Sequence, residues 1–122
     1  MKISLEASRL PRKSDLYLKD ILECIETIEQ QSPTLEKLES TRFFRDGIVR
    51  NLEIIGEAVS QIPDEIKEAH PEVPWTKIKN FRNAAIHKYR SIDTDVVWDI
   101  IQNKLTALKE QVQDILNGPG RI

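Results

Sequence analysis

The sequence predicts an all-α fold, an antiparallel up-and-down bundle of four main helices. Three observations favour it. Apolar residues recur at intervals of three and four along four stretches, which is the spacing of an amphipathic helix. No stretch alternates apolar and polar residues as a half-buried strand does. A length of 122 residues with only four glycines suits one helical domain, residues 1–122.

The first helix is expected to follow a loose N-terminal arm, residues 1–13, which shows no clear period. Ser14 is typical of an N-cap, because a serine hydroxyl can accept from the free backbone N–H groups of the first turn. Asp15 would then lie in the first turn, where the helix dipole favours a negative charge. The apolar pattern ends near Gln31, since Pro33 cannot continue a helix.

The second main helix is expected over residues 41–61. A short helical turn over 35–40, capped by Thr34, precedes it. Gly47 and Gly56 lie inside the apolar pattern of this helix. Because glycine destabilises a helix interior relative to alanine, each is expected to mark close packing against a neighbour.

The second half of the chain holds the other two main helices. A proline-rich link with room for one helical turn, residues 63–74, leads to a third helix expected over 75–89. Asp93 or Thr94 is the expected cap of the fourth helix. This helix is predicted to run unbroken until Asn117-Gly118 ends it.

Composition narrows the function classes. No stretch is long and apolar enough to span a membrane, and the first residues lack the apolar run of a signal peptide. The single Cys24 fits a reducing compartment, so we expect a cytoplasmic protein. The two histidines, His70 and His87, stand outside any Cys/His cluster, and we therefore expect neither a metal site nor a cofactor.

One segment concentrates positive charge on a chain whose net charge is −2. Residues 73–92 contain five basic residues and no acidic one, whereas the rest of the chain has 13 basic and 20 acidic residues. The five are Lys77, Lys79, Arg82, Lys88 and Arg90. Such a segment is typical either of a phosphate-binding surface or of a lysine-rich solvated helix face, and charge alone leaves both open.

Helix geometry separates the polar residues of the third helix from its apolar stripe. At about 100° per residue, Asn83 and His87 become neighbours on a face away from the stripe, and Arg82 lies at the stripe's edge. The stripe is Trp75, Ile78, Phe81, Ala85 and Tyr89. His87 is therefore not expected in the core and is either a functional group or an idle surface residue.

Arg82 and His87 are the residue types that RNA cleavage without a metal requires. Imidazole titrates near neutral pH and can take the proton of a ribose 2′-hydroxyl or give one to the leaving 5′-oxygen. A guanidinium offers a fork of donors to the phosphoryl oxygens as their charge builds. Asn83 could hold a phosphate oxygen or orient His87. One histidine serves poorly as acid and base together, but a two-fold dimer would supply two.

The run Arg82-Asn83-x-x-x-His87-x-Tyr89 resembles the signature of HepT proteins, the toxin branch of the HEPN superfamily. Two further stretches resemble the same family: Asn51-Leu52-Glu53-Ile54-Ile55-Gly56-Glu57-Ala58 and Val73-Pro74-Trp75. The likeness extends from about Asp15 to Leu116. The spacing of the arginine and histidine is weak evidence alone, but the three stretches in this order are specific.

The resemblance implies a HEPN-like bundle that forms a homodimer and acts as a metal-independent endoribonuclease, the toxin of a type VII HepT/MntA-like toxin–antitoxin system. It implies catalytic roles for Arg82 and His87 and a supporting role for Asn83. An MntA-like nucleotidyltransferase antitoxin would transfer AMP onto Tyr89, whose hydroxyl must then reach the surface, and the added phosphate would block RNA beside Arg82. The expected RNA-binding residues are Lys77, Lys79, Lys88 and Arg90.

Two other functions compete with this interpretation. HEPN domains also serve as non-catalytic binding modules that help a partner nucleotidyltransferase to bind nucleotide or substrate. The Arg82/His87 pair favours the enzyme, because a binding module needs no acid–base group. A structural helical adaptor would leave the acid-free basic segment unexplained. Dependence of RNA loss on His87 distinguishes the enzyme from the binding module.

Overall fold

The computed structural model describes residues 13–88 and 93–118, with the backbone alone at 86–88. All secondary structure in these residues is helical, which confirms the predicted all-α class. The helices are α2 (Lys13–Gln30), α3 (Leu35–Ser40), α4 (Arg42–Gln61), α5 (Asp64–Ala69), α6 (Trp75–Lys88), α7 (Thr94–Asn103) and α8 (Leu105–Leu116).

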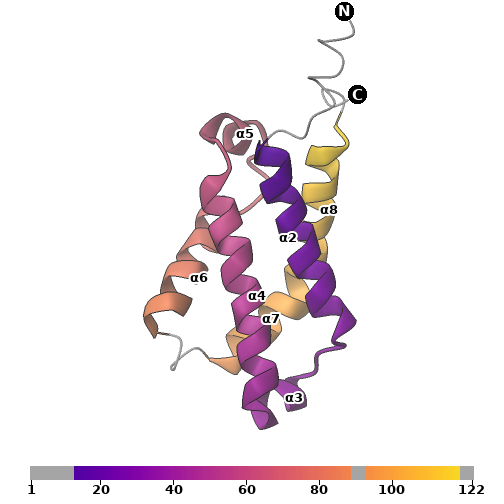
Figure 1. The fold of residues 1–122 in the computed structure, drawn as a ribbon, viewed down its shortest axis with the longest axis vertical. Coiled ribbons are helices and arrows are strands. Elements are labelled where there is room, and N and C mark those ends of the chain that lie inside the picture. The colour runs from indigo at the N-terminus through magenta and orange to yellow at the C-terminus, as the bar shows by residue number, and fades with distance from the viewer. Residues whose placement is uncertain (1–12, 89–92, 119–122) are drawn as a thin grey trace, which may run out of the picture.

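The long helices form four antiparallel legs (Figure 1). Helices α2, α4 and α6 alternate in direction, and α7 and α8 together make the fourth leg. Helix α4 lies at the centre of one side and packs against both α2 and α6, while α8 packs against α2. This is the expected up-and-down bundle, and it leaves α6 in extensive contact with α4 alone.

The beginning of α2 differs from the expectation. The helix starts at Lys13, inside the arm expected over residues 1–13, and the remainder of that arm lies outside the described residues. Ser14 is therefore a buried residue of the first turn and not the cap. At the other end, Ser32 takes a left-handed φ of 47°, which ends the helical path as Ser32-Pro33 predicted.

The cap of α3 is confirmed. Thr34 has extended backbone, and its Oγ1 accepts a hydrogen bond from the backbone N–H of Lys37 at 3.1 Å. This satisfies one of the donors that every helix start leaves without a partner.

The fourth leg corrects a prediction, because it is two helices and not one. Asp93 caps α7 as expected, accepting from the backbone N–H of Asp95 at 2.9 Å. At Lys104 the backbone leaves the helical conformation, with φ −121° and ψ −37°. The break lets the two halves pack differently: α7 lies against α3, and α8 lies against α2. Apolar periodicity continues across Lys104, so it gave no sign of the break.

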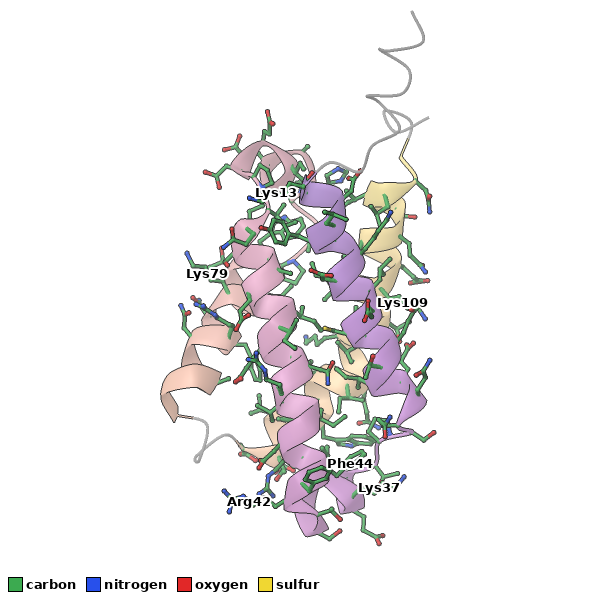
Figure 2. The ribbon with its side chains drawn as sticks, viewed as in Figure 1. Lys13, Lys37, Arg42, Phe44, Lys79 and Lys109 are labelled. Carbon is green, nitrogen blue, oxygen red and sulfur yellow. The ribbon has the colours of Figure 1, made fainter. Side chains whose placement is uncertain are left out.

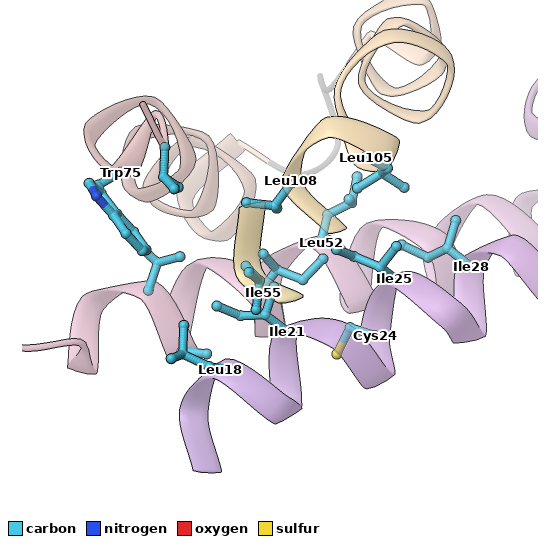
Figure 3. Packing of buried hydrophobic residues seen from close by; sticks show 14 of the residues in the cluster. Leu18, Ile21, Cys24, Ile25, Ile28, Leu52, Ile55, Trp75, Leu105 and Leu108 are labelled. Atoms are coloured by element: carbon cyan, nitrogen blue, oxygen red, sulfur yellow. The ribbon is translucent and has the colours of Figure 1, made fainter. Parts of the chain in front are cut away.

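The core fills the space between the legs with aliphatic side chains (Figure 3). It includes Leu18, Ile21 and Ile25 from α2, Leu52, Ile55 and Val59 from α4, and Leu105, Leu108 and Val112 from α8. Cys24 is buried among them and packs as a small apolar side chain. Burial, with the nearby negative charges of Asp20 and Glu23, raises the pKa of its thiol to about 11. None of the described helices is long and apolar enough to cross a bilayer.

Candidate functional site

The helix that carries the basic motif is fixed by its apolar stripe. Trp75 and Ala85 are buried, and Ile78 and Phe81 pack against the core from the same side of α6. The Trp75 indole N–H donates to the backbone carbonyl of His70 at 3.0 Å, which holds the start of α6 to the preceding link. The predicted stripe is confirmed for these four residues, and Tyr89 lies outside the described residues.

Arg82 sits where α6 approaches α4 most tightly. A methyl group built on Gly56 of α4 would overlap the Cβ of Arg82 and would lie 2.8 Å from its Cγ and 3.4 Å from its Cα. Any side chain larger than hydrogen at position 56 would therefore push Arg82 away. The expectation of close packing is confirmed at Gly56. It is wrong at Gly47, where no neighbouring atom lies within 4 Å of an added Cβ.

The guanidinium of Arg82 is turned toward Asn83. Its Nη1 donates to the Oδ1 of Asn83 at 2.9 Å. The half-buried Arg82 therefore directs its terminal nitrogens across the face on which Asn83 lies. Its Nε is buried and has no hydrogen-bond partner among the described residues. Because a buried donor without a partner costs about 1–3 kcal/mol, such a group is a candidate for function.

The backbone of α6 carries the motif through His87 and Lys88. Helix geometry places the Cα of His87 on the same face as that of Asn83, one turn further along. The side chains of His87 and Lys88, and all of Tyr89 and Arg90, lie outside what the structure describes.

The expected RNA-binding lysines of α6 do not share one surface. Lys77 borders an apolar groove of about 460 Å³ between α6 and the α7–α8 leg, whose floor includes Leu52 and Ile55. Lys79 lies about 60° from Arg82 around the helix, on the side of Asn83, and its exposed side chain extends from the outer side of α6 (Figure 2). Only Lys79 of this pair is placed to extend the surface around Arg82.

A polar groove of about 310 Å³ adjoins Arg82. Three helices line it: α2 gives Tyr17 and Asp20, α6 gives Arg82, and α4 gives Ile54, Glu57, Ala58, Ser60 and Gln61. The apolar spacing and the motif did not predict this groove. Glu57 lies in residues 51–58, one of the stretches that resemble the family, and this resemblance was the one sequence signal for a residue of the groove. No sequence feature indicated Asp20.

The carboxylates of this groove differ in their partners. Glu57 is held by Arg50 at 3.5 Å, and the same arginine lies 3.6 Å from Glu53. Asp20 is exposed and forms no ion pair with any other described residue. Across the described ranges, no group of three or more His, Cys, Asp or Glu side chains is placed to hold a metal ion.

Comparison with known proteins gives consistent matches. The sequence model of the family described as ribonuclease HepT-like matches residues 21–115. A Thermococcus cleftensis protein named "Probable ribonuclease HepT" is 35% identical over 101 residues, covering 81% of this chain and 92% of the relative. A "Putative RNase" of Caldanaerobacter subterraneus subsp. tengcongensis is 37% identical over 102 residues, covering 82% and 91%.

A longer relative shares only part of its length. A protein of Methanocaldococcus jannaschii, named as a gamma-glutamylcyclotransferase and "putative RNase", is 33% identical over 103 residues. The match covers 83% of this chain and 46% of that protein, so this chain spans less than half of it. No solved structure gives a significant match.

Proposed function

Because the chain belongs to the ribonuclease HepT-like family, we propose that it is a metal-independent endoribonuclease whose chemistry is carried by Arg82 and His87. One observation carries the proposal. Arg82 is held from two sides, by the close approach of Gly56 and by the hydrogen bond to Asn83, and it is turned toward the face of α6 on which His87 lies. A cation fixed in this way is preorganised for a phosphate, since little further ordering is needed on binding.

The reaction balances without an added reagent. A base removes the 2′-hydroxyl proton, the 2′-oxygen attacks the adjacent phosphorus, and the bond from phosphorus to the 5′-oxygen breaks. An acid returns a proton to that oxygen, which leaves a 2′,3′-cyclic phosphate and a 5′-hydroxyl. His87 acts as the acid–base group, because imidazole exchanges protons near neutral pH. Arg82 stabilises the phosphoryl oxygens, and Asn83 positions Arg82 through its Oδ1.

A homodimer completes the catalytic pair in this proposal. Each chain offers one motif histidine, whereas acid and base act on opposite sides of the phosphorus. A two-fold axis beside the polar face of α6 would bring a second His87 to the same phosphate. Lys79 would extend the RNA surface, while Lys77 lies toward the apolar groove. The Cα of Lys88, eleven residues further on, falls on the same side of the helix as that of Lys77.

In the cell, we propose that the chain is the toxin of a HepT/MntA-like pair. An MntA-like nucleotidyltransferase would transfer AMP from ATP to the hydroxyl of Tyr89, with release of pyrophosphate and of the hydroxyl proton. The negative phosphate of the attached AMP would compete with RNA for Arg82 and would repel the RNA backbone. Mass spectrometry of the chain co-expressed with such a transferase, compared with a Tyr89→Phe variant, tests this step.

The test of the nuclease uses purified protein, total RNA and an excess of chelator. We expect the wild-type chain to leave 2′,3′-cyclic phosphate ends and His87→Ala to leave none. His70→Ala, which removes the other histidine of the chain, is the matched control. The His70 side chain lies 3.4 Å from the Glu72 carboxylate, outside the motif. The Trp75 indole N–H donates to the backbone carbonyl of His70, so the substitution keeps that hydrogen bond. Arg82→Lys keeps the Cβ and Cγ that pack on Gly56 but removes the planar fork, so cleavage should fall sharply in a folded protein.

The outcomes separate the competing functions. Cleavage that survives in His87→Ala would remove this residue from the chemistry. Equal inactivity of wild type and His87→Ala, once mass spectrometry shows that Tyr89 carries no AMP, would favour the non-catalytic binding module. Circular dichroism of each variant shows that the helices are retained.

A further inference from the structure

We propose that the polar groove beside Arg82 binds a guanine base of the RNA next to the scissile phosphate, with Asp20 as its principal acceptor. The inference rests on the proposed nuclease function and adds a base preference to it. The groove and the phosphate-binding side chain share a wall, because Arg82 lines the groove while its Nη1 turns to Asn83. A nucleotide whose phosphate meets Arg82 therefore has its base within reach of the groove.

The groove has the size and walls for a single flat ring. Its volume of about 310 Å³ is at the low end for ligand sites, which suits one base better than a whole nucleotide. The partly buried Tyr17 offers an aromatic wall, and Ile54 and Ala58 give an apolar floor on α4. Splayed RNA bases stack on such aromatic side chains, and their exposed edges are then hydrogen-bonded by polar groups.

The polar groups of the groove select against phosphate and in favour of a donor-rich base edge. Arg82 lines the groove as well, but its Nη1 turns to Asn83, so a phosphate placed between the negative Asp20 and Glu57 would be repelled. A guanine presents its N1–H and its amino group side by side, and one carboxylate can accept from both. No other RNA base offers two adjacent donors on its Watson–Crick edge.

Asp20 is better placed for this role than Glu57. Glu57 is already held by Arg50 at 3.5 Å, while Asp20 has no cationic partner among the described residues. Asp20 is exposed on α2, so a base can reach it without displacing an existing ion pair. Gln61, also exposed, adds both a donor and an acceptor at the rim, which can meet the remaining atoms of the base.

The first arm of the test measures cleavage. Oligoribonucleotides of one length, each with a single guanine or adenine at the same position, are cut by wild type and by Asp20→Asn. The substitution keeps the shape but replaces an acceptor with a donor. We expect wild type to cut beside guanine and Asp20→Asn to lose that preference by about tenfold or more, as for one bidentate base contact. Glu110→Gln, an exposed carboxylate on α8, is the matched control and should keep the preference.

The second arm measures binding without chemistry. Guanosine and adenosine 3′-monophosphates are titrated into wild type and Asp20→Asn, and chemical shifts are followed. If wild type binds the guanine nucleotide preferentially and Asp20→Asn does not, the result supports a guanine site in the groove. This result would hold even if the protein cut no RNA. In that case the proposed nuclease function would fail and the base site would stand. The inference is overturned if wild type binds both nucleotides equally, or if Asp20→Asn retains the guanine preference. Equal binding is also the result expected if the groove instead accepts a cationic side chain of a protein partner.

Discussion

Replacing Gly56 with alanine tests whether the tight contact between α4 and α6 holds Arg82 in place. Helix α4 contains two glycines, and both have negative φ, so alanine is compatible with either backbone. In an unobstructed helix interior, the change from glycine to alanine stabilises by about 0.5–1 kcal/mol. Gly47 is unobstructed, with nothing within 4 Å of an added methyl, and Gly47→Ala should give this gain.

At Gly56 the same methyl meets Arg82. The overlap involves the Cβ of Arg82, which is attached directly to the backbone and cannot rotate away, so α6 itself must shift. Overpacking of this kind costs about 1–3 kcal/mol, which outweighs the gain in helix propensity. We therefore expect Gly56→Ala to be less stable than Gly47→Ala by about 1–3 kcal/mol.

Urea unfolding followed by circular dichroism measures both variants under the same conditions. RNA cleavage should fall in Gly56→Ala at temperatures where the protein is still folded, because the guanidinium moves with α6, and it should be unchanged in Gly47→Ala. A Gly56→Ala protein that gains stability as Gly47→Ala does would refute the close approach. If Gly56→Ala were destabilised but kept full activity, the contact with α4 would not be what holds Arg82 in its active position.

Three further predictions follow. Burial raises the pKa of Cys24 from 9.0 in the unfolded chain to about 11 in the folded chain. The protonated thiol therefore contributes to the free energy of unfolding below pH 9, and this contribution is lost between about pH 9 and 11. Over this window the urea midpoint should fall less steeply in Cys24→Ala than in wild type. Thr34→Ala removes the acceptor of the Lys37 N–H and should cost about 1 kcal/mol by the same assay, and an unchanged midpoint would show that the cap contributes nothing. Asn83→Ala frees Arg82 and should slow RNA cleavage about tenfold or more, because a hydrogen bond to a charged group contributes about 1.5–3 kcal/mol; the rates are compared at a temperature where both proteins are folded.

The features that depend on local sequence could be predicted. Helix existence follows from apolar spacing, and the caps at Thr34 and Asp93 follow from residue type, because both depend on residues within one turn. The helical rotation of about 100° per residue placed Arg82 at the edge of the apolar stripe of α6 and Asn83 on its polar face. It would also have placed Lys77 about 140° from Arg82, away from the proposed phosphate surface.

The features that depend on packing between helices could not be predicted. The glycine at position 56 signalled a close neighbour, but nothing in the sequence identified that neighbour as Arg82. The groove joins Asp20 to Arg82, which are distant in the chain and meet only after α2, α4 and α6 have packed. The break at Lys104 has neither a glycine nor a proline to mark it, and it arises because α7 and α8 pack on different partners.

The one-sided attachment of α6 ties the proposed catalytic helix to the bundle mainly through a single neighbour. It rests on α4, and its opposite flank faces the apolar groove instead of a packed neighbour. A helix held on one side can detach in a partial opening that leaves the contacts among α2, α4 and α8 intact. Its amide hydrogens should therefore exchange with solvent sooner than those of α4. On heating, the protein should lose its nuclease before it loses its helical signal, so a thermal melt alone would overstate the range in which it works.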